Sequence, residues 1–160
     1  MGQQQLLLVI LVTIIVGIAT VVAINTFGTA ADQANIDAVN NDIATLASAA
    51  QGYYMRPGML GGGGRTFNGG ETNDAISFSG LAFPSDAQNN TAETPSALNE
   101  NGIYILKDIG GQAFTIEAHP ASCEGYTPDV DTAPCDTPLT AGVGANTFDL
   151  GGTASSITST

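Results

Sequence analysis

The chain has 160 residues, of which 15 are acidic and 3 are Lys or Arg, giving a formal net charge of −12. This charge excludes nucleic acid as a partner, because binding phosphates requires Lys and Arg side chains. The length allows one modest domain beside a membrane-spanning helix. Charged residues make up only 11% of the chain, and Gly, Ala, Ser, Thr and Asn dominate the remainder. That composition is more typical of surface-layer and filament proteins than of cytosolic enzymes.

An uncharged apolar stretch occupies residues 6–24, which is about the length needed to cross a bilayer as a helix. Its polar interruptions, Thr13 and Thr20, can each donate to a carbonyl one turn earlier, which lowers their cost in an apolar medium. The stretch lacks the positive flank and the small-residue cleavage site of a secretory signal peptide. The side chains expected to form its assembly surface are Leu6, Leu7, Leu8, Val9, Ile10, Leu11, Ile14, Ile15, Ile18, Val21, Val22 and Ile24.

Helical periodicity continues beyond this stretch. Apolar residues recur at steps of three and four, which places them on one stripe of a helix. The acidic and amide side chains from Asp32 to Asp42 fall mostly on the other faces. The predicted stripe consists of Ile36, Val39, Ile43, Leu46, Ala50 and Tyr53.

The helix is expected to end near Tyr54, because the residue before Pro57 avoids helical geometry. The sequence therefore predicts three parts. Residues 1–28 form an apolar assembly or transmembrane half of the helix, and residues 29–55 form an amphipathic half. Residues 56–160 form a β-rich globular head with a cysteine loop near its C-terminal end.

Alternating patterns in the head predict several strands. A half-buried strand is expected at 75–83, followed by a polar loop at 85–99. The clearest β pattern is a pair of alternating runs at 102–108 and 113–118 around a Gly-Gly turn, which predicts an antiparallel hairpin packed against the helix stripe. One more short strand is expected within 143–150.

Four consecutive glycines, Gly61 to Gly64, follow the helix. A phosphate-binding loop would lie between a strand and a helix and end in Lys with Ser or Thr, and this context is missing. We therefore expect a tight linker whose backbone passes close to the helix or to a neighbouring subunit.

Cys123 and Cys135 flank a loop-like segment, and the simplest interpretation is a disulfide that closes it. The alternative is a metal site with His119, at a spacing that matches no standard zinc pattern. His119 has no nearby Ser or Cys of catalytic-triad type, so no catalytic residues and no enzymatic activity are expected.

Two further sites are hypotheses from sequence. Asn89 begins an Asn-Asn-Thr pattern, which is a glycosylation acceptor in exported proteins. Several carboxylates held together by the disulfide loop would suit Ca²⁺, although their spacing differs from the twelve-residue Ca²⁺ loop. No other cofactor is expected. The candidate Ca²⁺ ligands are Glu124, Asp129, Asp131 and Asp136.

The uninterrupted helix at residues 3–54 resembles the N-terminal helix of type IV pilins and their relatives, the type II secretion pseudopilins and archaeal filament proteins. This resemblance implies an α+β fold, with a long N-terminal helix packed on a small antiparallel sheet. It also implies processing after Gly2, which would leave Gln3 as the first mature residue. The chain departs from the family at the fifth mature position, where Leu7 replaces the usual Glu, and it has no proline in the helix before Pro57.

From this resemblance we expect a structural subunit that polymerises with copies of itself into an extracellular filament at the cell surface. The implied partners are the inner membrane, which would hold a precursor pool, and a pilus assembly machinery. The alternatives are a single-pass membrane-anchored exported protein and a secretion-system pseudopilin.

Overall fold

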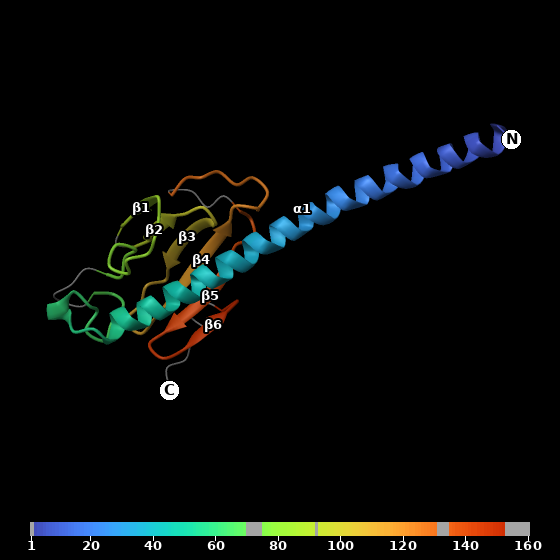
Figure 1. The fold of residues 1–160 in the computed structure, drawn as a ribbon. Helices are drawn as coiled ribbons and strands as arrows, with labels where there is room; N and C mark the ends of the chain where they lie inside the picture. The colour runs from blue at the N-terminus through green and yellow to red at the C-terminus, as the bar shows by residue number, and fades with distance from the viewer. Residues whose placement is uncertain (1, 70–74, 92, 131–134, 153–160) are drawn as a thin grey trace. The chain divides into compact units, whose positions relative to one another are not determined.

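The computed structural model describes residues 2–69, 75–91, 93–130 and 135–152 (Figure 1). The main helix, α1, spans Gly2–Met55, and a short 3₁₀ helix, η1, spans Gly58–Leu60. The chain divides into two compact units, Met1–Ala34 and Asn35–Thr160. The second part of α1 therefore belongs to the same unit as the strands, which we call the head.

The head contains a six-stranded antiparallel sheet in which every strand pairs with its neighbours in sequence, giving the order β1-β2-β3-β4-β5-β6. The hairpin predicted around the Gly-Gly turn is confirmed by the pairing of β3 with β4, and it lies at the centre of the sheet. The strands are β1 (Ala87–Asn89), β2 (Ser96–Leu98), β3 (Gly102–Lys107), β4 (Ala113–Pro120), β5 (Leu139–Gly144) and β6 (Phe148–Leu150).

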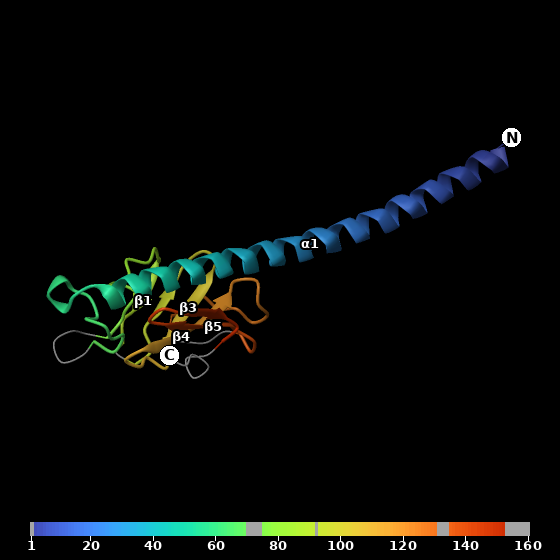
Figure 2. The same cartoon turned by 90° about the horizontal axis from the view of Figure 1, so that it is seen from below.

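The part of α1 within the head lies across one face of this sheet, as the two views in Figures 1 and 2 agree. Five residues of the predicted stripe are buried, and Ala47 joins them, whereas Ile36 at its start is only partly buried. Side chains alternate along a strand, so Tyr104 and Leu106 of β3 and Phe114 and Ile116 of β4 point to the same face. All four are fully buried in one cluster with the stripe. The α+β fold with a helix packed on an antiparallel sheet is confirmed.

The glycine run closes the C-terminal end of α1. The last carbonyls of a helix have no partner within the helix. Here the amide of Gly63 donates to the Tyr53 carbonyl over 2.9 Å, and the amide of Arg65 donates to the Tyr54 carbonyl over 2.9 Å. A Cβ on Gly63 would collide with the Thr66 carbonyl oxygen and the Tyr53 ring. The backbone thus passes close to the helix, as the sequence predicted.

The opposite face of the sheet is covered by the segment that follows β4. Ile103 and Ile105 alternate with the helix-facing residues of β3, yet both are buried. Ser96 donates its hydroxyl to the Val130 carbonyl over 2.6 Å, and the amide of Cys135 donates to His119 Nδ1 over 3.3 Å. Val130 and Cys135 of the cysteine loop therefore lie against the face of the sheet that is turned away from the helix.

Two predictions in the head were wrong. Residues 75–83 form turns and not a strand, because Phe78, Leu81 and Phe83 are all buried from one compact turn. The predicted polar loop at 85–99 contains β1 and β2. The short strand expected within 143–150 is confirmed by β6, and the same region also contains the end of β5.

Substitution of two glycines at the end of α1 should have opposite effects. Gly63→Ala should lower the free energy of unfolding by about 1–3 kcal/mol, because its Cβ has no space. Gly52→Ala, within α1, meets nothing within 4 Å and should raise it by about 0.5–1 kcal/mol. Urea unfolding of the full chain in detergent measures both. Equal effects of the two changes would contradict the packing described here.

Candidate functional site

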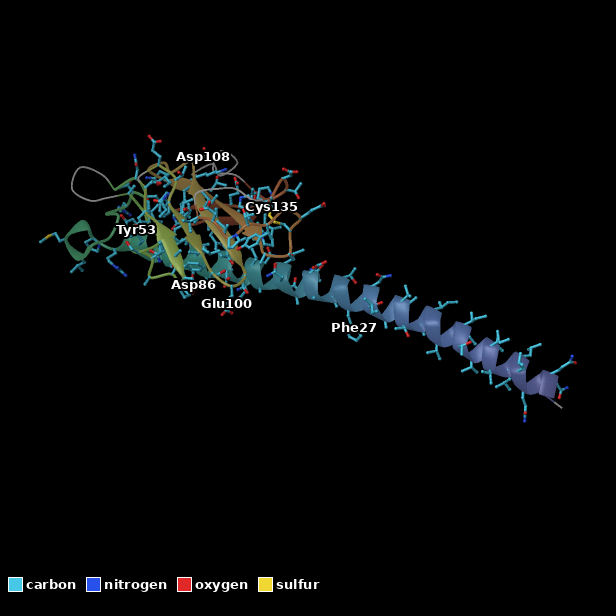
Figure 3. All side chains as sticks on the ribbon, turned by 90° about the horizontal axis from the view of Figure 1, so that it is seen from above. Phe27, Tyr53, Asp86, Glu100, Asp108 and Cys135 are labelled. Atoms are coloured by element: carbon cyan, nitrogen blue, oxygen red, sulfur yellow. A yellow bond between two sulfur atoms is a disulfide. The ribbon has the colours of Figure 1, made fainter. Side chains whose placement is uncertain are left out.

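The first unit of the chain presents an apolar surface on all sides of α1, as Figure 3 shows for the side chains up to Phe27. The twelve side chains predicted to form the assembly surface are 50–69% exposed, and Phe27 is 76% exposed. Among the described residues, α1 is the helix whose length and composition would allow it to cross a membrane. An N-terminal helix of this kind is typical of a membrane anchor or a signal sequence. A helix that is apolar all round is normally buried by something else.

The threonine hydroxyls in this unit donate to carbonyls of the helix itself. The Thr13 hydroxyl donates to the Ile10 carbonyl over 2.8 Å, and the Thr20 hydroxyl donates to the Val16 carbonyl over 2.8 Å. The expectation for these two residues is confirmed, and the Thr26 hydroxyl donates in the same way to the Val22 carbonyl. The hydroxyls therefore need no water, which suits an apolar environment.

A polar network at Asp42 joins the helix to the sheet. Asp42 Oδ2 accepts from the Tyr104 hydroxyl over 2.6 Å, from Asn101 Nδ2 over 2.8 Å and from Asn99 Nδ2 over 3.0 Å. Asp42 belongs to the polar residues that were expected mostly on the other faces of the helix, and here it is partly buried and reaches the sheet. A carboxylate with three donors is well satisfied, so the residue fixes the position of the helix over β3.

The same network acts on Tyr104. Its side chain is fully buried, and burial raises the pKa of the phenol well above its ordinary value of 10.0. The hydrogen bond to Asp42 and the negative charge of that carboxylate raise this pKa further. Tyr104 therefore stays neutral in the folded protein.

Other polar contacts hold α1 to the head just before the first residue of the stripe and just after its last residue. Asn35 donates to the Asn101 carbonyl over 3.0 Å and accepts from the Ser122 amide over 3.1 Å. The Tyr54 hydroxyl donates to Gln112 Oε1 over 2.7 Å. The helix is therefore fastened to the loops at both ends of the β3–β4 hairpin.

A second network lies on the opposite face of the sheet. Because the amide of Cys135 donates to His119 Nδ1, the proton of the neutral ring is on Nε2, which donates to Glu117 Oε1 over 2.9 Å. Glu117 Oε2 pairs with Lys107 Nζ over 2.7 Å. Both ring nitrogens are thus engaged, and the buried imidazole connects the sheet to the cysteine loop.

The structure joins Cys123 to Cys135 in a disulfide with Cα atoms 6.0 Å apart, as the sequence predicted. Neither sulfur is available as a metal ligand. Within the described residues, no group of three or more His, Cys, Asp and Glu side chains is arranged to hold a metal ion. Of the candidate Ca²⁺ ligands, Glu124, Asp129 and Asp136 are exposed, and Asp131 lies outside the described residues.

The remaining predicted sites lie far apart in sequence. Gly2 and Gln3 are exposed in the first turn of α1. Asn89 is the last residue of β1 and is partly buried. Glycosylation and processing at these positions stay predictions.

Comparison with models of protein families, with curated proteins and with solved structures finds no match to this chain.

Removing the Asp42 carboxylate should destabilise the head. Asp42→Ala leaves the buried Tyr104 hydroxyl and two amides without their acceptor, so we expect the free energy of unfolding to fall by about 2–4 kcal/mol. Asp32→Ala, a change of equal charge at an exposed helix position, should alter it by less than about 0.5 kcal/mol. Thermal and urea unfolding of the full chain in detergent distinguish these outcomes. A loss of stability at both positions would assign the effect to charge and not to the network.

The raised pKa of Tyr104 predicts a loss of stability in alkali. Below about pH 10 the phenol is neutral in both the folded and unfolded states, so it contributes no pH dependence. Above that pH the unfolded chain releases a proton that the folded chain retains, and the free energy of unfolding should decrease with pH. Tyr104→Phe should make this decrease shallower between about pH 10 and pH 12 while leaving the slope near pH 8 unchanged. An identical alkaline slope in the variant would rule out this assignment.

Proposed function

We propose that this protein is the repeating subunit of an extracellular filament of the type IV pilus kind. The observation that carries the proposal is the apolar surface at residues 6–24, where each large side chain is about half exposed or more. Covering one such side chain contributes about 1.5–3 kcal/mol, so the segment strongly favours an apolar environment over water. Lipid supplies that environment first, and the same segment of neighbouring subunits replaces lipid when the filament forms.

The internal hydrogen bonds of the threonines support an apolar environment on every side of the helix. A bundle of such helices buries Thr13 and Thr20 without leaving a hydroxyl unpaired. The acidic composition of the chain also suits densely repeated heads, because like charges oppose lateral clumping.

The exposed apolar helix supports a second candidate equally well. A single-pass membrane protein with an exported head would bury the same residues in lipid and never polymerise. A pseudopilin that forms only short assemblies is an intermediate case. The proposal predicts long filaments outside the cell. The alternatives predict no polymer or only short assemblies.

The test is electron microscopy of material sheared from producing cells, with mass spectrometry of its N-terminal peptide. We expect filaments that contain this chain, with Gln3 as the first residue of the peptide. If the chain is found only as monomers in the membrane fraction, the filament proposal fails and the single-pass protein replaces it.

Variants in the helix sharpen this test. Ile15→Asp puts a charge at an apolar position, which costs several kcal/mol in a lipid or helical environment, so sheared filaments should disappear. Thr13→Val, two residues away, keeps the segment apolar and should leave the filament yield unchanged. Filaments of normal yield from Ile15→Asp would contradict a role for this surface in assembly.

A further inference from the structure

A second apolar surface lies at the C-terminal end of α1, within the head. Met55, Met59 and Leu60 are 68%, 99% and 71% exposed. They belong to residues 55–65, which we call the tip, and Figures 1 and 2 both show this segment as a closed turn beyond the end of the helix. The burial of residues 6–24 proposed above leaves this surface unexplained.

The tip is held in place by the backbone and is not a loose loop. The amide of Gly64 donates to the Arg56 carbonyl over 3.0 Å, and the amide of Gly62 donates to the Pro57 carbonyl over 3.3 Å. The amide of Gly61 closes η1 on the Gly58 carbonyl over 3.0 Å. A surface that is already ordered loses little conformational entropy when it binds.

The tip also concentrates positive charge. The chain has three Lys and Arg residues, and Lys107 is paired with Glu117. The other two, Arg56 and Arg65, are exposed in the tip, and within the described part of the chain no ion pair involves either of them. Methionine and arginine are both enriched in protein interfaces.

The head carries a surface of opposite charge at a different place. An open depression of about 530 Å³ is lined by Asp42, Asp86 and Glu100 together with Pro84 and Ser85 and two Asn side chains. Within this lining, Asp86 and Glu100 are exposed and lie on the same side of the head (Figure 3). Asp42 forms part of its wall through the network with Tyr104.

We propose that the tip of one subunit docks onto this acidic depression of a second copy of the chain. Two different patches on each molecule make a heterologous contact, which propagates an open polymer where the rotation between subunits does not close into a ring. An anionic membrane fits the tip less well, because the head as a whole is acidic and would be repelled by it. The inference rests on the proposed filament and identifies which parts of neighbouring heads meet.

Cysteine cross-linking on producing cells tests the contact. The two natural cysteines are joined to each other, so an introduced thiol reports only its own neighbours. A chain with Met59→Cys and Ser85→Cys should form a ladder of multimers under mild oxidation, because each subunit links its tip to the next depression. Either single variant should give no ladder. Leu150→Cys with Ser85→Cys is the matched control, since Leu150 is also an exposed apolar residue of the head but lies outside the tip.

Charge reversal provides the second measurement. Arg56→Glu with Arg65→Glu, added to the double-cysteine chain, should reduce the multimer yield about tenfold or more through like-charge repulsion. Adding Asp86→Arg and Glu100→Arg should restore the ladder, because the charges are then exchanged between the two surfaces.

The outcomes separate the two proposals. Filaments by electron microscopy without a ladder would overturn the tip contact and leave the filament intact. Dimers from Met59→Cys alone would overturn it in favour of a symmetric tip-to-tip contact, and a cross-link to a different protein would overturn it as well. If neither filaments nor multimers form, both proposals fail together.

Discussion

The stripe of α1 from Val39 to Tyr53 must be kept from water, and the arrangement of the head depends on this requirement. Tyr104, Phe114 and other large side chains of the central strands meet the stripe on one face of the sheet. Aromatic pairs extend that cluster to the segments between helix and sheet, since Phe67 packs edge-on against Phe114 with ring centroids 5.0 Å apart. Polar contacts at Asn35, Asp42 and Tyr54 then fix where along the sheet the helix lies.

The two units of the chain differ in how their apolar side chains are covered. In the head, the stripe is covered by the chain's own strands, and Val130 and Cys135 lie against the opposite face of the sheet. In the first unit, residues 6–24 are covered by nothing in the described structure, although they are more apolar than the stripe. The head therefore buries its own core, whereas the first unit requires an environment that the described chain does not provide.

Sequence periodicity predicted the elements in which the pattern of apolar residues repeats over many positions. The helix stripe and the β3–β4 hairpin were found because each keeps one period over several turns or pairs. The strands β1 and β2 were missed because each has three residues, too few to reveal alternation, and because Gln88 and Asn89 resemble loop residues. The segment 75–83 alternates like a strand, yet Ala82 has a positive φ of 51°, which bends the chain into a turn.

Asp42 could not be assigned from periodicity, since its role depends on partners nearly sixty residues away in sequence. The glycine run was interpreted correctly, since a Cβ at Gly62 or Gly63 would collide with neighbouring backbone, and Gly61 and Gly64 have positive φ. The exposed tip was missed because Met and Leu beside a turn are usually taken to be buried.

The edge strands of the sheet, β1 and β6, determine how much unpaired backbone the head exposes. This matters for a protein kept at high local concentration, whether in a membrane or in a polymer. An unpaired strand edge is a template on which another chain can add, and long flat edges lead to aggregation. Here β1 and β6 are both three residues long, while the longer strands lie between them. Heads brought side by side therefore offer one another very little open backbone, so crowding need not lead to amyloid-like sheet extension.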